Sequence, residues 1–279
     1  RNPPNSTLRA SAYNYFHSGA FDATTHSTLL KTSGPMSRVV HVLLLCALAF
    51  PSHAGAPQIN VGVLFDYLQP GSSNLLKRIR NTGAGTAYVR VEVAEIVFDA
   101  DDKPVEVPVD APSLVRNAPG AHGVIASPSR LIIAGNGQQA TRLVYRGLRD
   151  EERYYRLRFV PVAPSAEEFS LSEEQAQQAA ELSSAIRVFT GFGTVLFIAP
   201  QHPRYDTRIE SGQIHNHGNA TIVLENLRQC ERAKVDACTT GIIVHVRPGR
   251  SHLLASDDTH FIRYDLKEGE RQRSIDSRR

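Results

Sequence analysis

The sequence predicts an all-β protein built on immunoglobulin-like β-sandwiches. Short runs of apolar and β-branched residues recur from Ile59 onward, separated by Asn, Gly and Pro turn signals. No helical pattern alternates with these runs, which argues against a parallel βαβ architecture. The run 185–200 ends at a proline, and strand patterning then starts afresh, which places a domain boundary near 199–203.

The strands of the first half follow from alternation of apolar and polar side chains. We expect strands within 59–68, 75–81, 86–98, 123–134, 139–147 and 153–162, followed by the long β-prone run 185–200. The most regular part, 127–162, contains no nucleophile, metal cluster or phosphate loop. It therefore indicates a scaffold rather than a catalytic pocket.

One helical stretch interrupts the strands, at 165–184. It is rich in Ala, Glu and Gln, and capping boxes are expected at Ser165 with Glu168 and at Ser172 with Gln175. It lacks a broad apolar face, so we expect a partly helical surface excursion between two strands.

The second half repeats a feature of the first. Asn81-Thr82-Gly83 precedes one extended run, and Asn216-His217-Gly218 precedes another. Two similar sandwiches in tandem would produce this repeat, although Asn-x-Gly turns are common in β proteins. We expect the charged residues 263–279 to form a short strand and a frayed tail.

The first 54 residues are expected to lie outside the fold. Residues 36–54 have the layout of a secretory signal peptide: Met36, a basic Arg38, an apolar run and a small-residue exit at Ala54. The apolar run is too short to span a bilayer, so no stable membrane insertion is expected. Residues 1–35 show no core-forming pattern, and we interpret them as upstream extension with translation starting at Met36.

The chain contains three cysteines, and two are expected to pair. Cys46 lies in the predicted signal peptide, whereas Cys230 and Cys238 remain in an exported chain, where an oxidising compartment favours a disulfide. A metal or redox pair is the alternative. The spacing does not fit C-x-x-C, and no histidine pair completes a metal site.

The sequence marks out no catalytic or metal centre. G-x-S-x-G, H-E-x-x-H and P-loop motifs do not occur, and the His215-Asn216-His217 turn lacks further ligands at a suitable spacing. A formal net charge of +3 is too small to indicate nucleic-acid binding. A stripe of arginines is interpreted as a solvated sheet face that pairs with Glu92, Glu95 or an acidic loop: Arg142, Arg146, Arg153, Arg156 and Arg158. No cofactor is predicted.

Several motifs in a fixed order resemble the periplasmic chaperones of chaperone-usher pili. The first half contains P-x-x-x-x-x-x-G from Pro128 to Gly135 and E-x-x-Y-Y from Glu151. The second half contains N-x-G-N-A-T from Asn216, then the cysteine pair, then P-G-R-S from Pro248, and is similar to the common-pilus (Mat-type) branch. The resemblance covers about Ile59 to His252.

The resemblance implies two immunoglobulin-like domains set at an angle around a cleft, 55–199 and 200–279 with its charged tail. A periplasmic chaperone of this kind is non-enzymatic and uses no cofactor. It folds and caps pilus subunits by donor-strand complementation and delivers them to an outer-membrane usher. A subunit lacks its last strand, and the chaperone lends one of its own. The alternative is an exported β-sandwich pilus subunit or a carbohydrate-binding adhesin.

In this sequence the lending strand is expected within 185–200. Counting by twos puts four residues on the face expected to meet the subunit: Ile186, Val188, Thr190 and Phe192. With the opposite parity these residues belong to the domain core, and Phe189, Val195 and Phe197 face the subunit. Gly191 and Gly193 leave room for a bulge that switches parity.

The sequence departs from the family at the group that anchors the subunit's terminal carboxylate. Well-studied branches use an arginine on the first strand and a lysine on the lending strand, and neither is present here. The candidates that remain are Arg187, Lys77 and Arg80, with no assignment among them.

Overall fold

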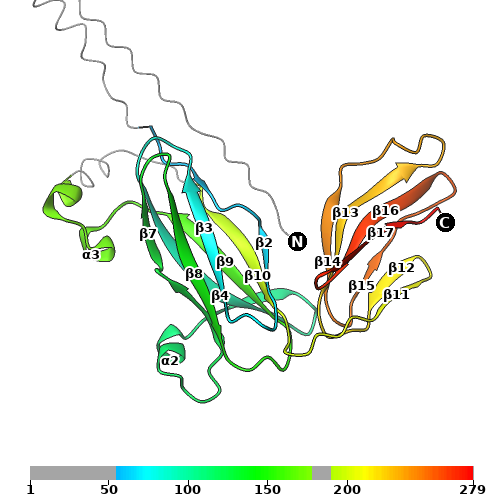
Figure 1. Ribbon diagram of the computed structural model, residues 1–279, viewed down its shortest axis with the longest axis horizontal. Helices are drawn as coiled ribbons and strands as arrows, with labels where there is room; N and C mark the ends of the chain where they lie inside the picture. Colours follow the sequence, from blue (N-terminus) through cyan, green and yellow to red (C-terminus); the bar gives the residue numbers. More distant parts are fainter. Residues whose placement is uncertain (1–54, 178–189, 279) are drawn as a thin grey trace, which may run out of the picture. The chain divides into compact units, whose positions relative to one another are not determined.

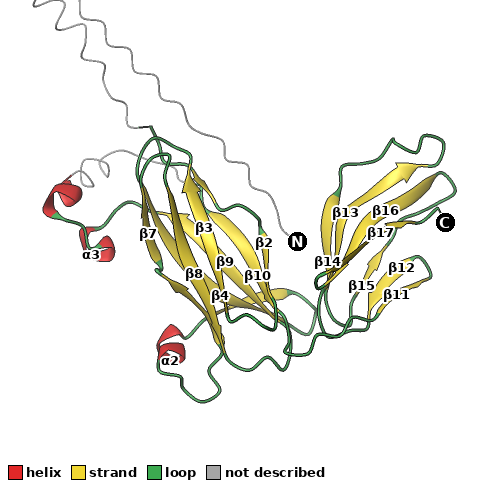
Figure 2. Ribbon diagram, in the orientation of Figure 1, coloured by secondary structure: helices red, strands yellow, loops and turns green. Residues whose placement is uncertain are grey.

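The computed structural model describes residues 55–177 and 190–278, and residues 53–279 form one compact unit. β-strands dominate the described residues, and the helices are short (Figure 2). The chain forms two β-sandwiches, as the alternating runs predict. The predicted upstream extension and signal peptide, 1–54, lie outside the described residues.

The first sandwich consists of two sheets. One has the strand order β1 (Ile59–Asn60), β3 (Asn74–Asn81), β8 (Gln138–Arg146) and β6 (Gly123–Ser127). The other has the order β2 (Phe65–Leu68), β10 (Phe192–Ile198), β9 (Arg153–Pro161), β4 (Ala87–Phe98) and β5 (Pro104–Pro108), and β7 (Arg130–Ile133) also pairs with β4 (Figure 1).

The second sandwich also has two sheets. The smaller has the order β11 (Thr207–Glu210), β12 (Gln213–Asn216) and β15 (Ser251–Leu253). The larger has the order β14 (Ile242–Val246), β13 (Ile222–Glu231), β16 (His260–Glu268) and β17 (Arg271–Asp276). The charged tail thus forms a longer hairpin strand than its sequence predicts, because β17 pairs along its whole length with β16.

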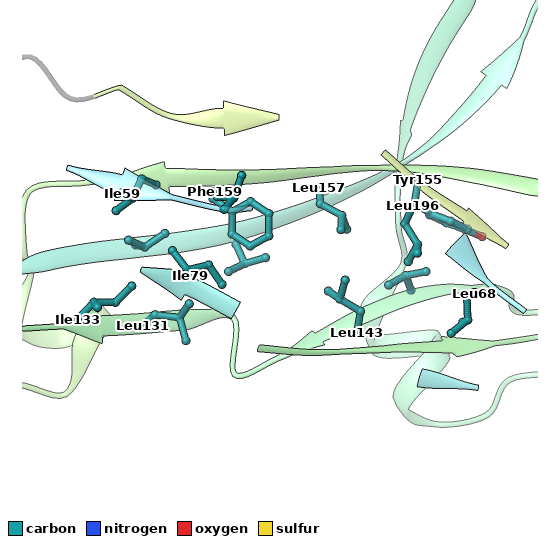
Figure 3. Close-up of a cluster of buried hydrophobic side chains, with 14 of the residues drawn as sticks. Ile59, Leu68, Ile79, Leu131, Ile133, Leu143, Tyr155, Leu157, Phe159 and Leu196 are labelled. Atoms are coloured by element: carbon teal, nitrogen blue, oxygen red, sulfur yellow. The ribbon is translucent and has the colours of Figure 1, made fainter. Parts of the chain in front are cut away.

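Each sandwich encloses its own apolar core. Figure 3 shows side chains of the first core, among them Ile79, Leu143, Leu157 and Phe159, which are fully buried. The second core gathers Ile214, Ile222, Leu224 and Tyr264 with their neighbours. The alternation of apolar residues along each strand supplies these inward faces.

Two of the predicted runs are each divided between the two sheets of the first sandwich. The run 59–68 gives β1, which pairs with β3, and β2, which pairs with β10. The run 123–134 gives β6, which pairs with β8, and β7, which pairs with β4. In the run 59–68 the apolar residues continue across the division, so that change of sheet leaves no gap in the pattern, whereas the run 123–134 is divided at Ser127-Pro128-Ser129.

The structure adds elements that the sequence pattern does not mark. β5 is exposed throughout and pairs with the end of β4. A short helix, α2 (Ala111–Val115), is capped by Asp110. In the excursion after β9, one of the two predicted capping boxes forms in full: Ser172 and Gln175 bond reciprocally, whereas Ser165 caps α3 (Ala166–Phe169) through its hydroxyl while the Glu168 carboxylate contacts Arg130 instead. Its remaining residues, 178–189, are outside the described part.

The Asn-x-Gly repeat corresponds to one structural device used twice. Asn81 is buried, accepts from the Gly83 N–H and donates to the carbonyls of Gly85 and Ile133. Asn216 is buried, accepts from the Gly218 N–H and donates to the carbonyls of Ala220 and Val246.

The glycine of each repeat is required by close packing. A Cβ on Gly83 would lie 2.2 Å from the Ala56 carbonyl oxygen, and one on Gly218 would lie 2.2 Å from that of Arg204. In both sandwiches, therefore, one asparagine satisfies buried backbone groups at a corner where another segment approaches too closely for a side chain.

Candidate functional site: strand β10 and its open edge

Strand β10 has one fully paired edge and one partly paired edge. It is antiparallel to β9 over its whole length, from Phe192 to Ile198. It is parallel to β2 only from Val195 onward, where the Val195 N–H donates to the Leu64 carbonyl at 2.8 Å. Among the described residues no strand pairs with the other edge of β10 at 192–194.

The backbone of Gly193 points to this open edge. The N–H groups along a strand alternate between its two edges, so Gly193 faces the same side as Val195 two residues later. Gly193 is exposed and adds no side chain at the edge. An incoming extended segment can therefore reach one free N–H and one free carbonyl here.

Exposed apolar side chains lie beside the open edge. Val63 and Leu64, in the crossing from β1 to β2, are 65% and 49% exposed. Leu64 is the residue whose carbonyl receives the Val195 N–H, so the two side chains belong to the segment at which pairing with β10 begins. Both residues fall within a predicted strand and were not among the predicted site residues; the run Val63-Leu64-Phe65 breaks the apolar alternation and is the signal that could have marked them.

The parity of the described part of the lending strand is clear. Phe192 is partly buried and packs against the first core, and Thr194, Leu196 and Ile198 share its inward face. Phe192 therefore has the position that the alternative parity gives it. Thr190 is exposed, whereas Ile186, Arg187 and Val188 lie outside the described residues. Which face a bound subunit meets stays a prediction.

Lys77 is not a free cation at the surface. Its ammonium lies 2.6 Å from Oδ2 of Asp66 and 2.6 Å from the Val63 carbonyl oxygen. The two side chains are 4% and 11% exposed. Lys77, the candidate anchor, is thus already paired within the sandwich, because its side chain lies on the inward face of β3 and reaches Asp66 of β2. Arg80, three residues later, is exposed.

Three arginines of the stripe, Arg153, Arg156 and Arg158, form ion pairs, as expected of a solvated sheet face, whereas Arg142 and Arg146 donate to Asn74 and Asn117. Arg153 contacts Glu95 at 3.1 Å and Glu151 at 2.9 Å. Arg158 contacts Glu106 of β5 at 2.6 Å, a partner that the sequence analysis did not name.

A histidine of the second sandwich packs on the strands that hold β10. The His245 ring centroid lies 4.3 Å from that of Phe65 and 4.8 Å from that of Phe197. The Tyr67 hydroxyl is 2.6 Å from His245 Nε2 and can donate to the neutral ring. Burial lowers the pKa of His245 to about 4 and raises that of Tyr67, so both groups are neutral at pH 7.

A buried carboxylate provides a second such contact. Glu152, at the start of β9, accepts from the Thr221 N–H, the Thr221 hydroxyl at 2.6 Å and the Tyr154 hydroxyl at 2.7 Å. Burial raises the pKa of Glu152, against the lowering effect of these hydrogen bonds. The Glu152 carboxylate thus links β9 to Thr221, the residue before β13.

The His-Asn-His turn is structural at its central residue. Asn216 makes the corner bonds described above, and the rings of His215 and His217 stack with centroids 6.0 Å apart. Over residues 55–177 and 190–278, no three His, Cys, Asp or Glu side chains come together as a metal site would require. The structure confirms the predicted disulfide between Cys230 and Cys238, at the end of β13.

The described residues include no helix of the length and apolarity needed to cross a membrane. The chain matches no family model. It is 26% identical over 218 residues to a probable fimbrial chaperone, EcpB, of Escherichia coli strain Crooks, covering 78% of this chain and 90% of that protein. EcpB of Shigella boydii is likewise 26% identical over 219 residues.

Solved structures of fimbrial chaperones also align with the chain. One is the class 5 fimbriae chaperone CfaA, with 17% identity, 78% of this chain and 98% of that chain covered, and a TM-score of 0.48. Another is the CsuC–CsuE chaperone–tip subunit complex of Acinetobacter baumannii, with 14% identity, 79% and 97% coverage, and a TM-score of 0.44. The sequence match over most of both chains identifies this protein as a homologue of the EcpB fimbrial chaperones.

Proposed function

We propose that this protein is a non-enzymatic chaperone that folds and caps pilus subunits by lending them β10 and the residues before it. The open edge of β10 at 192–194 is the observation that carries the proposal. A subunit that lacks its last strand has unpaired backbone groups and an exposed apolar groove. β10 supplies the complementary backbone groups, and Val63 and Leu64 supply apolar surface beside them.

The residues assigned to the subunit remain those of the lending segment. We propose that Ile186, Val188 and Thr190 meet the subunit and that a bulge at Gly191 reverses the parity before Phe192, which packs on the domain core. Because Lys77 is committed to Asp66, Arg187 and Arg80 are the remaining candidates for holding a subunit's terminal carboxylate.

The cellular setting follows from the same proposal. We assign residues 36–54 to a signal peptide, residues 1–35 to upstream extension, and the two domains to 55–199 and 200–279. The chaperone then works in the periplasm and passes its subunit to an outer-membrane usher. The disulfide between Cys230 and Cys238 is compatible with an oxidising compartment.

Co-purification from the periplasm tests the proposal. The tagged protein is expressed in its source bacterium, and bound proteins are identified by mass spectrometry and sized as a complex. A chaperone yields a one-to-one complex with a pilus subunit that is degraded when the chaperone is deleted. Self-polymerisation of the tagged protein, or its own degradation without another chaperone, would instead identify a pilus subunit or adhesin.

Replacement of Val188 by Asp tests the lending segment. We expect capture of the subunit to be abolished while the free protein keeps its fold, because a charge cannot enter an apolar groove. Loss of the fold would show that Val188 belongs to the domain core, and hence that the opposite parity is correct.

A further inference from the structure

The ion pair between Lys77 and Asp66 joins the two sheets of the first sandwich. Lys77 lies on β3, in the sheet with β1 and β8, whereas Asp66 lies on β2, in the sheet with β10. The ammonium contacts both the Asp66 carboxylate and the Val63 carbonyl at 2.6 Å. Lys77 therefore holds a side chain and a backbone group that flank Leu64 and Phe65.

The contacts of Lys77 with Val63 and Asp66 lie where the chain passes from one sheet to the other. β1 ends at Asn60, the turn at Gly62 has a positive φ of 71°, and β2 begins at Phe65. The first bond to β10 is made by the Leu64 carbonyl, and Asp66 then lies opposite Leu196. The two groups held by Lys77 thus enclose the point at which β2 joins β10.

Apolar pattern alone does not fix that point. Val63, Leu64 and Phe65 are all apolar, and Val63 and Leu64 are largely exposed, so sliding β2 by two residues would preserve its inward and outward faces. Such a slide would cover the open edge of β10 near Gly193. It would also separate Asp66 from Lys77 and leave buried charges unpaired, which is strongly unfavourable.

We propose that Lys77 and Asp66 are positioning residues that fix the start of β2 and keep the edge of β10 at 192–194 free for a partner strand. The inference rests on the proposed function for the identity of that partner. The position of β2 itself is independent of it. Buried charged pairs that specify register rather than add stability are known in other folds.

Amide hydrogen exchange on the full-length protein tests the position of β2. In the wild type we expect a protected Val195 amide and a rapidly exchanging Gly193 amide. The variant with Asp66→Leu and Lys77→Met replaces the pair by apolar side chains of similar size. We expect exchange at Gly193 to slow at least tenfold, and capture of the subunit identified by co-purification to weaken at least tenfold.

A matched control is the exposed pair of Arg90 and Glu92 on β4, 3.0 Å apart. The variant with Arg90→Gln and Glu92→Gln should change neither readout. If the apolar variant does not fold, the variant with Asp66→Asn and Lys77→Gln carries the same measurements, with the same expected direction. Unchanged exchange at Gly193 together with wild-type capture would overturn the inference. Failure of the wild type itself to bind a subunit would overturn the proposed function instead.

Discussion

The two sandwiches share a corner and differ in what else they bury. Asn81 and Asn216 satisfy backbone groups in the same way, each beside a glycine that another segment approaches closely. The first sandwich also buries a charged pair, Lys77 with Asp66, next to the strand with an open edge. The second sandwich instead has a disulfide, which joins Cys230 at the end of β13 to Cys238 in the following loop. Within residues 55–177 and 190–278, the proposed subunit-binding edge thus lies in the first of two sandwiches that share this corner.

The charged pair should give the largest effect. Lys77→Met leaves the Asp66 carboxylate buried without its partner, and we expect a loss of about 3–5 kcal/mol in the free energy of unfolding. Urea denaturation followed by circular dichroism measures this loss. Lys267→Met in the second sandwich is the control, because its pair with Glu225 is partly exposed; it should cost less than about 1 kcal/mol. Equal losses of unfolding free energy in the two variants would show that the buried pair of the first sandwich contributes no more than the partly exposed pair of the second.

The shared corner predicts equal effects in the two copies. Asn81→Ala and Asn216→Ala each leave buried backbone groups without partners, and each should cost about 3 kcal/mol. Hydrogen exchange of Ile79 and Ile222 reports the first and the second core separately. A loss of stability in only one of the two variants would show that the Asn-x-Gly motif does not have the same structural role in both sandwiches.

The disulfide should matter only to the second sandwich. Replacing Cys230 and Cys238 by Ala removes a short closed loop, and we expect a loss of about 2 kcal/mol. The same exchange experiment should show faster opening at Ile222 and no change at Ile79. Faster exchange at both residues would mean that the two cores open together.

His245 makes the contact between the sandwiches depend on pH. The folded pKa, about 4, lies below the unfolded value, so the unfolded chain takes up a proton first as pH falls below about 6.5. Stability should therefore decrease between pH 6.5 and 4, by at most about 3 kcal/mol, and the contribution of His245 should then stay constant at lower pH. His245→Gln should flatten that part of the stability profile; an unchanged slope would assign it to other groups.

Local patterns predicted much of this fold. Alternation located most strands, both serines act as predicted N-caps, and the Cys230–Cys238 bridge is present. Each of these features depends on residues close together in sequence. The Asn-x-Gly repeat was visible for the same reason, although its hydrogen bonds to Ile133 and Val246 were not.

The features that the sequence did not predict depend on which sheet each strand joins. The run 59–68 is apolar on both sides of Gly62, so its division between two sheets leaves no trace in the pattern. The partner of Lys77 follows from that division, as does the contact of His245 with Phe65. The prediction of Lys77 as an anchor could not anticipate a partner in the opposite sheet.

The backbone edge of β10 at Gly193 is the central claim, and a matched pair of variants tests it most directly. Gly193→Pro removes the N–H that faces the open edge, whereas Gly193→Ala keeps it and adds a methyl group that meets only the Arg156 side chain, whose Cδ and Nη1 would lie at ordinary contact distances of 3.6 and 3.9 Å. The affinity for the co-purified subunit is measured for both folded variants. We predict at least a tenfold loss for the proline variant and near wild-type binding for the alanine variant. Equal binding by the two variants would contradict strand lending at this edge.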